Sequence, residues 1–533
     1  MFGRFFFLFA LFSLVSEFAF AQKYPGYKVT ALTNESKGYY FLCPIQLPAG
    51  TIAPTQMILD STGKVVYYKP IPLIVNTSDF KIQQNGDITY NYHAQFYRMD
   101  SNFNIIDSIL PKNGVTIDTH DFQILPNGHY LFIGSELVNM DLITYKYFNK
   151  GTTYGSKNAS VKCGVIQELD ENKNVVFEWH CKDYYSFGDV DPFFLNGPDN
   201  VDWNHMNAVA FDKDGNILLS VRHFDEITKI NRKDSSIIWR LGGKRNQFKF
   251  TNDSMMFFGQ HDIRRINNGS ITLFDNGRVA GPFNPSAAKE YVLDEVNHTA
   301  TLAWKYIQDS TLYSTGLGNV QRLSNGNTLV DYGDYIKSNI IFSVVNTAGS
   351  KVFEITSNDS LLSYRGFNYF TLPWKLNRPQ ITCSLSGGKY YLDAGAGHAK
   401  YLWSNGDTTQ TIQVNGEDTF SVFVPIGKGG FISSLPFITS SHTNPCSFTS
   451  IKERVNSQSF SIYPNPIHDE LIILTDDFTI RNYSYEIFDM LGNKVKASVD
   501  QPLEQRISIS VNDLKNGIYM LNFDGIWKKF IKE

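Results

Sequence analysis

The sequence predicts an all-β protein: a six-bladed β-propeller, followed by an Ig-like β-sandwich and a small C-terminal β-sandwich. Its composition favours strands, because 14 % of the 533 residues are aromatic and only 19 % are charged. A unit of two hairpins, or four strands, recurs at intervals of about 40–50 residues, which is typical of propeller blades. After Pro373 this repeat stops, and shorter strands rich in Gly, Ser and Thr replace it.

Residues 1–21 are predicted to be a signal peptide and not part of the fold. The apolar run Phe5–Val15 precedes Ala19-Phe20-Ala21, an A-x-A cleavage signal, so the mature chain is expected to begin at Gln22. The run is too short for a membrane span, and no later segment approaches the required length of about twenty apolar residues. The net charge is −4 without a basic block, which argues against nucleic acid as a partner.

The propeller repeats are recognised by their turns. Each first hairpin has Asn-Gly or Asp-Gly in its turn, as in NAVAFDKDGNILLSV, because both positions of a two-residue turn need a positive φ. A remaining strand near Leu361–Phe370 is expected to close the ring onto the first blade. Two separate sandwiches are the alternative, but they do not predict one repeat in six copies. The units begin near residues 39, 78, 120, 205, 261 and 318.

Two long insertions interrupt the repeats, at Val138–Lys162 and Asp183–Trp203, and we expect them to form a lid at the mouth of the channel. The changes in composition also predict where the domains begin and end. The predicted domains are the signal peptide at 1–21, the propeller at 22–375, the Ig-like domain at 376–447, a polar linker at 448–458 and the C-terminal domain at 459–533.

Five cysteines in an exported chain predict disulfide bonds. Cys163 and Cys181 flank a strand–turn–strand sequence symmetrically, which predicts a bridge across a hairpin that stabilises the fold by roughly 3 kcal/mol. Cys383 and Cys446 enclose one small domain and are the candidates for a second bridge. Cys43 is then left over and is expected to be buried.

Three histidines occupy matching positions in three blades. His120 and His261 each lie eight residues before the turn glycine of their blade, and His205 lies ten residues before its own. Because the innermost strands of a propeller converge on the central channel, these positions face one another at one mouth. We expect the three imidazoles to form a cluster, with Asn207 and Arg222 beside it on the fourth blade. These basic and hydrogen-bonding groups suit an anion.

The C-terminal segment 459–533 carries three spaced motifs. They are Tyr463-Pro464-Asn465-Pro466, Asp489-Met490-Leu491-Gly492 and Leu514-Lys515-Asn516-Gly517-Ile518-Tyr519. In these motifs the segment resembles the C-terminal sorting domain of the type IX secretion system of Bacteroidetes. The resemblance implies export through the periplasm to the cell surface or the medium, with the type IX secretion machinery as a partner.

A second set of motifs runs through the propeller: H-x-N in DWNHMNAVAF, R-H in SVRHFD, W-x-L-G-G in IIWRLGG and Q-H-D in GQHDIRR. Over roughly residues 39–370 the chain resembles the bacterial aryl-sulfate sulfotransferase family. The resemblance implies a six-bladed propeller that moves a sulfuryl group from an aryl sulfate to a phenolic acceptor through a sulfohistidine, without the nucleotide donor PAPS and without a metal.

The resemblance also assigns roles to residues. The family's nucleophilic histidine falls on His261 in Gln260-His261-Asp262. A hydroxyl residue of the family's last blade falls on Asn319, which is an asparagine here. The remaining catalytic positions fall on His120, His205 and Arg222, and a substrate-binding position falls on Asn207.

The chemistry of these residue types agrees with sulfuryl transfer, which needs positioning and charge neutralisation more than a strong base. A neutral His261 can attack sulfur, Arg222 and Asn207 can hold the sulfonyl oxygens, and His120 or His205 can protonate the leaving phenolate. Three alternatives stay open: a hydrolase with a metal held by three histidines, which the charge of Arg222 opposes, a propeller that binds ligands without catalysis, and a structural adhesin.

Overall fold

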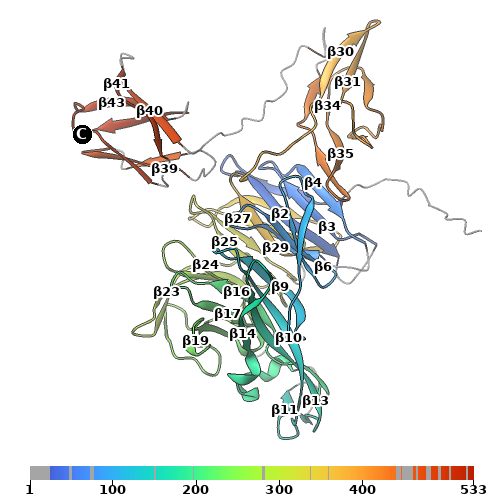
Figure 1. Ribbon diagram of the computed structural model, residues 1–533, viewed down its shortest axis with the longest axis vertical. Coiled ribbons are helices and arrows are strands. Elements are labelled where there is room, and N and C mark those ends of the chain that lie inside the picture. The colour runs from blue at the N-terminus through green and yellow to red at the C-terminus, as the bar shows by residue number, and fades with distance from the viewer. Residues whose placement is uncertain are drawn as a thin grey trace, which may run out of the picture.

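A computed structural model provides the structure of the protein. Among its described residues the chain is all-β, apart from four short 3-10 helices (Figure 1). The predicted signal peptide at 1–21 and linker at 448–458 lie outside the described residues. The structure describes residues 24–46, 51–72, 77–148, 152–195, 197–278, 283–335, 338–357, 359–439, 446, 460–463, 466–475, 482–489, 494–502, 506–523 and 526–533.

Six antiparallel four-stranded sheets are described between residues 39 and 369. In the first sheet, the innermost strand comes from the end of this region and the other three come from its beginning. The first sheet contains β2 (Tyr39–Gln46), β3 (Thr55–Leu59), β4 (Val65–Pro70) and the closing strand β29 (Leu361–Tyr369). The second contains β5 (Thr77–Ile82), β6 (Ile88–Tyr92), β7 (Phe96–Met99) and β8 (Ile105–Ile109). The third contains β9 (Thr116–Ile124), β10 (Tyr130–Met140), β13 (Ala159–Leu169) and β14 (Val175–His180).

The remaining three sheets follow the same meander. The fourth contains β16 (Met206–Phe211), β17 (Ile217–Val221), β18 (Glu226–Ile230) and β19 (Ile237–Gly242). The fifth contains β21 (His261–Arg265), β22 (Ile271–Asp275), β23 (Ala287–Asp294) and β24 (Thr299–Tyr306). The sixth contains β25 (Asn319–Arg322), β26 (Thr328–Asp331), β27 (Ile340–Val345) and β28 (Lys351–Thr356).

The innermost strands of these sheets, which include β29 in the first sheet, contact one another in a closed ring. β29 contacts β5, β5 contacts β9, β9 contacts β16, β16 contacts β21, β21 contacts β25, and β25 contacts β29. A closed ring of inner strands with four-stranded sheets running outward is the arrangement of a β-propeller. The predicted unit starts coincide with β2, β5, β9, β16, β21 and β25, and the predicted closing strand pairs with β2.

Additional strands extend three of the sheets at their outer edges. β1 (Lys28–Leu32) pairs with β28, and β20 (Lys249–Thr251) pairs with β24 in parallel. In the third case, β36 (Gly430–Ser433), from the segment predicted to be Ig-like, pairs with β4. The outer edges of the fifth, sixth and first sheets are therefore covered.

The segment predicted to be Ig-like continues the first sheet. β36 is followed outward by β35 (Val422–Ile426) and β32 (Leu402–Trp403) (Figure 1). Two smaller sheets complete the segment, with strands β30 (Thr382–Ser386), β31 (Lys389–Asp393), β33 (Thr411–Val414), β34 (Asp418–Phe420) and β37 (Phe437–Thr439). Tyr67 of β4 and Trp403 of β32 belong to one buried apolar cluster, so this segment and the propeller share a core.

The C-terminal segment forms two further sheets around a core of its own. One contains β38 (Phe460–Tyr463), β39 (Glu470–Thr475) and β42 (Arg506–Ser510). The other contains β40 (Asn482–Asp489), β41 (Lys494–Pro502), β43 (Gly517–Phe523) and β44 (Ile526–Lys532). Leu471, Ile487 and Phe530 lie in the buried cluster between them.

The disulfide bond joins Cys383 to Cys446, as one of the two sequence predictions expected. The predicted Cys163–Cys181 bridge is wrong in this structure, where both are free, buried thiols, as is Cys43. The reason is a β-bulge. Leu169 pairs with Val175 next to the turn, but Glu168 pairs with Phe177, so the register shifts by one residue before it reaches Cys163. The two cysteines are therefore not opposite each other, although the nearby Cys163 thiol and burial both raise the pKa of Cys181.

Candidate active site

The starts of the inner strands depart from regular strand geometry, and this is what brings the candidate residues together. The pairing register shifts between Ser78 and Lys81, between Met206 and Ala208, and between His261 and Arg264. Asp79, His205 and Asp262 have positive φ angles of 54°, 46° and 58°. In a regular strand, neighbouring side chains point to opposite faces. A bulge removes this alternation locally, so two successive side chains can both point into the channel.

The structure brings the three predicted histidines together. The rings of His120 and His205 pack edge to face with centroids 4.9 Å apart. Burial lowers the pKa of His261, and its proximity to Arg222 and to both of these histidines adds to this effect, so the three rings lie close together. The grouping that was predicted from blade alignment is therefore present at one end of the inner strands.

His261 is 1 % exposed, and its hydrogen bonds define its tautomer. Asn276 donates from Nδ2 to Ser314 Oγ and to the Leu317 carbonyl, so its Oδ1 is free to accept a hydrogen bond. Nδ1 of His261 lies 2.6 Å from this Oδ1 and 3.1 Å from the Gly259 carbonyl. Both partners are acceptors, so Nδ1 carries the proton and Nε2 carries the lone pair.

Nε2 of His261 accepts a hydrogen bond of 3.2 Å from the Leu317 amide. Burial is the main cause that holds the pKa of His261 well below its usual value of 6.5, and the charge of Arg222 adds to it. The imidazole is therefore neutral at neutral pH. A neutral, buried imidazole with a lone pair on a defined nitrogen is suited to nucleophilic attack.

Arg222 is a half-buried cation, and among the described residues it forms no ion pair with a carboxylate. Its Nη2 donates to the Thr315 carbonyl at 2.6 Å, and its Nη1 lies 2.9 Å from Nε2 of His223. Nε is buried and has no hydrogen-bond partner among the described residues. Burial lowers the pKa of Arg222. Asp202 and Asp225 favour its charged form without pairing with it directly, so an anion bound beside it would supply the direct partner that the described residues do not provide.

The two candidate asparagines have different surroundings. Asn207 is buried in β16, and its Nδ2 donates to the Gln260 carbonyl at 2.7 Å, whereas its Oδ1 has no partner among the described residues. It thereby holds the residue that precedes His261. Asn319 donates to the Gly366 carbonyl and accepts from the Gly366 amide, both at 2.9 Å. Both ends of its amide group are thus bonded to β29, which ties Asn319 to the neighbouring inner strand.

His120 and His205 are each held by a carboxylate. Nδ1 of His120 contacts Asp118, which also accepts a hydrogen bond from Lys162. Nδ1 of His205 lies 2.5 Å from Asp202 Oδ2. Burial is the largest cause that lowers the pKa of His205, and Asp202 opposes this effect. The carboxylates fix both rings by their Nδ1 atoms and leave each Nε2 for a substrate.

A pocket lined by Arg222 lies next to the residues that hold His261. Its cavity volume is about 100 Å³, and its wall includes Gly259 and Asn276, the two partners of His261 Nδ1. Arg278 pairs with Asp191 at 3.2 Å. Burial holds the pKa of Asp225 well above its usual value, which favours its uncharged form, so among the described lining residues Arg222 carries the unpaired charge. The remaining lining residues are mostly aromatic or small, namely Phe193, Phe194, Asp225, Phe258, Gly277, Tyr313, Ser314 and Thr315.

The aromatic walls place the two arginines. Arg222 lies over the ring of Phe194 at 4.8 Å, and Arg278 lies over that of Phe258 at 5.0 Å. Phe193 and Phe194 belong to the insertion Asp183–Trp203, within the 3-10 helix Pro192–Phe194. None of the described residues lining the pocket comes from Val138–Lys162. An aromatic pocket with one free cation suits an aryl group that carries an anionic substituent.

Sequence reasoning missed several residues of this site. His223 showed no blade register, yet its ring stacks on His205 at 4.8 Å and on Phe194 at 4.7 Å. It directly follows Arg222 in the R-H motif, and that adjacency was the available signal. Asn276 directly follows β22 and Tyr364 lies on β29, and no local pattern connects them to the histidines. The ring centroids of Tyr364 and His120 are 5.6 Å apart.

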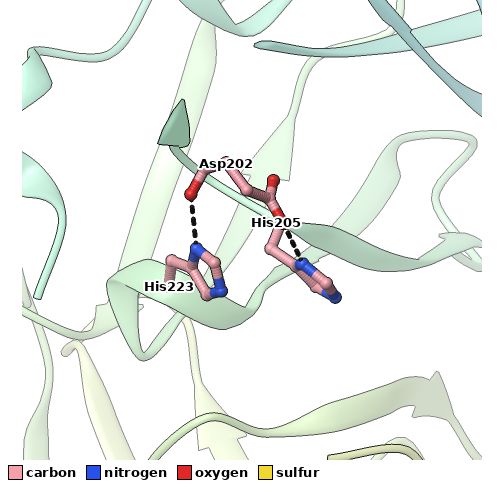
Figure 2. A group of neighbouring side chains, drawn as sticks. All are labelled: Asp202, His205 and His223. Atoms are coloured by element: carbon pink, nitrogen blue, oxygen red, sulfur yellow. Dashed lines mark hydrogen bonds and ion pairs between the residues drawn. The ribbon is translucent and has the colours of Figure 1, made fainter. Parts of the chain in front are cut away.

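Asp202, His205 and His223 offer ligand atoms within 4.8 Å of one another (Figure 2). Their bonds do not suit a cation. Nδ1 of His223 donates to the Asp202 backbone carbonyl at 2.8 Å, and its Nε2 already faces the guanidinium of Arg222. A metal ion at this point would be repelled by that charge at short range.

Residues 314–317 form a segment, here called the strap, that contacts both His261 and Arg222. Its Thr315 carbonyl accepts from Arg222, and its Leu317 amide donates to Nε2 of His261. Gly333 permits this close packing, because a Cβ there would lie 2.5 Å from the Gly316 carbonyl oxygen. The strap therefore occupies the two groups that a substrate would use.

Comparison with known proteins gives the following matches. Residues 37–365 match the arylsulfotransferase (ASST) family, and residues 461–533 match the secretion system C-terminal sorting domain. The sorting domain indicates export to the medium or the cell surface by the type IX secretion system. No helix among the described residues has the length and apolarity to cross a membrane. No curated protein matches the chain.

The solved structures that match this chain include two examples of distant likeness. A protein of unknown function from Bacteroides caccae has 11 % identity and a TM-score of 0.38, covering 62 % of this chain and 98 % of its own. Virginiamycin B lyase from Staphylococcus aureus, in a catalytically inactive form with quinupristin, has 12 % identity and a TM-score of 0.28, with coverages of 76 % and 98 %. These likenesses carry no argument about this chain. The family match over residues 37–365 covers more than half of it, and the protein therefore belongs to the arylsulfotransferase family.

Proposed function

We propose that this protein is an aryl sulfotransferase that moves a sulfuryl group from an aryl sulfate to a phenol through a sulfohistidine at His261, without PAPS. Membership of the family supports sulfotransferase activity in general. The observation that carries the finer proposal is the neutral, buried His261, with its lone pair on Nε2, beside the unpaired charge of Arg222. The aromatic pocket next to both residues supplies a place for the aryl ring.

In the first half of the reaction, Nε2 of His261 attacks sulfur. The S–O bond to the aryl group breaks, its electron pair leaves with the phenolate, and a histidine Nε2–H protonates that oxygen. Burial lowers the pKa of His205, which disfavours its protonated form. We assign the acid to His120, whose Nδ1 contacts Asp118 and whose Nε2 is left for the substrate. Arg222 neutralises the charge on the sulfuryl oxygens. The Leu317 amide must first leave Nε2, so the strap moves when the donor binds.

The second half reverses these steps. The acceptor phenol gives its proton to the histidine that acted as acid, and its oxygen attacks sulfur. The N–S bond breaks and its electron pair returns to Nε2 of His261, so proton and charge balance over the cycle. Two half-reactions through one covalent intermediate constitute ping-pong chemistry.

The proposal is tested by incubating the purified protein with p-nitrophenyl sulfate and phenol. We expect p-nitrophenol and phenyl sulfate to form in equal amounts. In a parallel assay without phenol, we expect the release of p-nitrophenol to become slow after the first turnover. Formation of inorganic sulfate in place of phenyl sulfate would identify a hydrolase. Binding of the donor without any turnover would identify a ligand-binding propeller.

The pH dependence follows from the neutral state of His261. Because its pKa lies well below 6.5, the imidazole keeps its lone pair as the pH falls through 6.5. We expect kcat/KM for p-nitrophenyl sulfate, whose leaving group needs little protonation, to stay constant from pH 8 to about 6.5 and to fall only below that range. A steady-state pH profile measures this. An acid limb at or above pH 6.5 would contradict a buried neutral nucleophile.

A further inference from the structure

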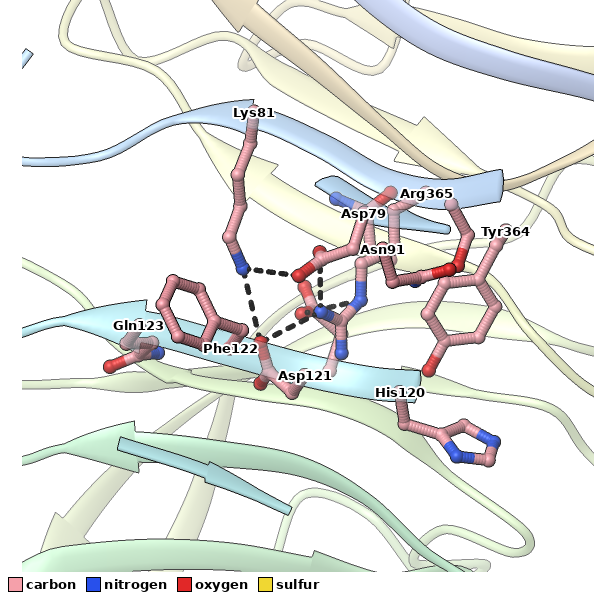
Figure 3. A network of polar contacts seen from close by, with 12 residues as sticks. Asp79, Lys81, Asn91, His120, Asp121, Phe122, Gln123, Tyr364 and Arg365 are labelled. Atoms are coloured by element: carbon pink, nitrogen blue, oxygen red, sulfur yellow. Dashed lines mark hydrogen bonds and ion pairs between the residues drawn. The ribbon is translucent and has the colours of Figure 1, made fainter. Parts of the chain in front are cut away.

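A network of buried charges lies next to the histidine cluster, with Arg365 of β29 at its centre (Figure 3). Nη1 of Arg365 donates to Asp79 Oδ1 at 2.9 Å and to Asp121 Oδ1 at 3.0 Å. Nη2 donates to the Asn207 carbonyl at 2.9 Å, and Nε lies 3.4 Å from Asp262 Oδ1. One guanidinium therefore connects the strands β5, β9, β16 and β21 to β29.

The last inner strand joins the same network through a carboxylate. Asp262 Oδ2 accepts a hydrogen bond of 3.3 Å from the Val320 amide of β25. Arg264 donates to Asp121 at 2.8 Å and forms an ion pair with Asp262 at 2.8 Å. All six strands that form the inner ring are thus tied together at one level of the channel, among the described residues.

The residues bound by Arg365 are the sequence neighbours of the candidate site residues. Asp121 directly follows His120, and Asp262 directly follows His261. Asn207 is two residues beyond His205. In Figure 3 the ring of His120 points away from Arg365, while Asp121 points toward it. At the starts of β9 and β21, the histidine therefore belongs to the site and the aspartate that follows it contacts Arg365.

We propose that Arg365 is a positioning residue, which sets the spacing between the nucleophile His261 and the acid His120. The inference rests on the proposed function. In-line transfer requires His261 to reach the sulfur and the proton donor to reach the oxygen at the other end of the same sulfur–oxygen bond. The distance between the two histidines therefore affects both nucleophilic attack and proton donation. A misplacement of about 1 Å can cost about 100-fold in rate.

The role of Arg365 is geometric, because the network is balanced in charge. Three carboxylates, of Asp79, Asp121 and Asp262, face three cations, of Lys81, Arg264 and Arg365. The cations that affect His261 are Arg222 and the neighbouring histidines. Loss of the Arg365 fork is therefore expected to slow the reaction while the acid limb of the pH profile stays where it is.

The test is Arg365→Lys, which keeps the positive charge but cannot reproduce the several hydrogen bonds that the planar guanidinium donates in fixed directions. The first half-reaction is measured in single turnover without acceptor, with p-nitrophenyl sulfate and with phenyl sulfate. Phenolate is a poor leaving group that depends on protonation, since phenols have a pKa near 10. We expect the rate to fall about 10-fold with the nitrophenyl donor and about 100-fold with phenyl sulfate, because the acid loses its place.

Arg232→Lys is the matched control. Arg232 also pairs with a buried carboxylate, Glu168, but lies away from the site, so its replacement is expected to change both donors equally. If Arg365→Lys does not fold, Asp79→Asn removes one partner of Arg365 that follows no histidine, and the same difference between donors is expected. Equal losses with both donors in a folded Arg365 or Asp79 variant would show that Arg365 is structural only. Absence of transfer in the unmodified protein would overturn the proposed function, and this inference with it.

Discussion

Replacing His261 by alanine is expected to reduce sulfuryl transfer at least ~10³-fold, because it removes the proposed nucleophile on which the covalent intermediate forms. In the unmodified protein, p-nitrophenyl sulfate without acceptor is expected to add about 80 Da, the mass of SO₃, to the chain. Rapid acid quench and intact-mass analysis measure this. The modified peptide is expected to contain Gln260-His261-Asp262.

His129→Ala provides the control for the His261 variant, because His129 pairs with Glu168 at 2.6 Å outside the site. It is expected to keep both transfer and the mass shift. A mass shift that mapped to His120 or His205 would keep the chemistry but move the nucleophile. Transfer without any covalent adduct under quench would favour direct transfer between the two substrates.

Truncation after Arg378 is expected to destabilise the propeller strongly, and this is the second large effect. The first sheet would lose β36 from its edge, and Tyr67 would lose its contact with Gly430, where a Cβ would lie 2.7 Å from the Tyr67 ring. Each large side chain exposed in the shared core costs roughly 1.5–3 kcal/mol. Thermal unfolding is expected to shift downward by more than 10 °C, since about 2–4 °C corresponds to 1 kcal/mol in a domain of this size.

A chain that ends at Cys446 is the control for the chain that ends at Arg378. It keeps β36 and the Cys383–Cys446 bridge and removes only the C-terminal sheets, which have their own core. The chain that ends at Cys446 is expected to unfold at the same temperature as the full-length protein. A chain ending at Arg378 that unfolds at that temperature would show that the two segments are independent, as their separate sequence patterns suggested.

The propeller could be predicted because its information is local. Each Asn-Gly or Asp-Gly turn defines a hairpin, and the repeat of hairpins gives the order of the sheets. The pairing of β36 with β4 could not be predicted in this way, since it joins residues more than 350 positions apart. The Cys163–Cys181 prediction depended on register, and a single bulge beside the turn was enough to shift it.

The site was predictable to the extent that blade alignment could bring residues together. His120, His205 and His261 share a position in the repeat, and Arg222 follows from the hairpin of the fourth blade. Asn319 was placed by resemblance alone, and both ends of its amide are bonded to Gly366. Arg365 had no pattern to identify it, because the closing strand β29 is outside the regular repeat.

The covered outer edges have a consequence for self-association. An unpaired edge strand presents N–H and C=O groups that can add a strand from another molecule and start aggregation. β20, β1 and β36 cover the edges of the fifth, sixth and first sheets, which are neighbours around the ring. Among the described residues, β8, β14 and β19 end the other three sheets. The fifth and first sheets now end in β20 and β32, which are only three and two residues long and offer few groups for pairing. Strand addition between copies of this exported chain is therefore expected mainly at the longer edge strands β8, β14 and β19.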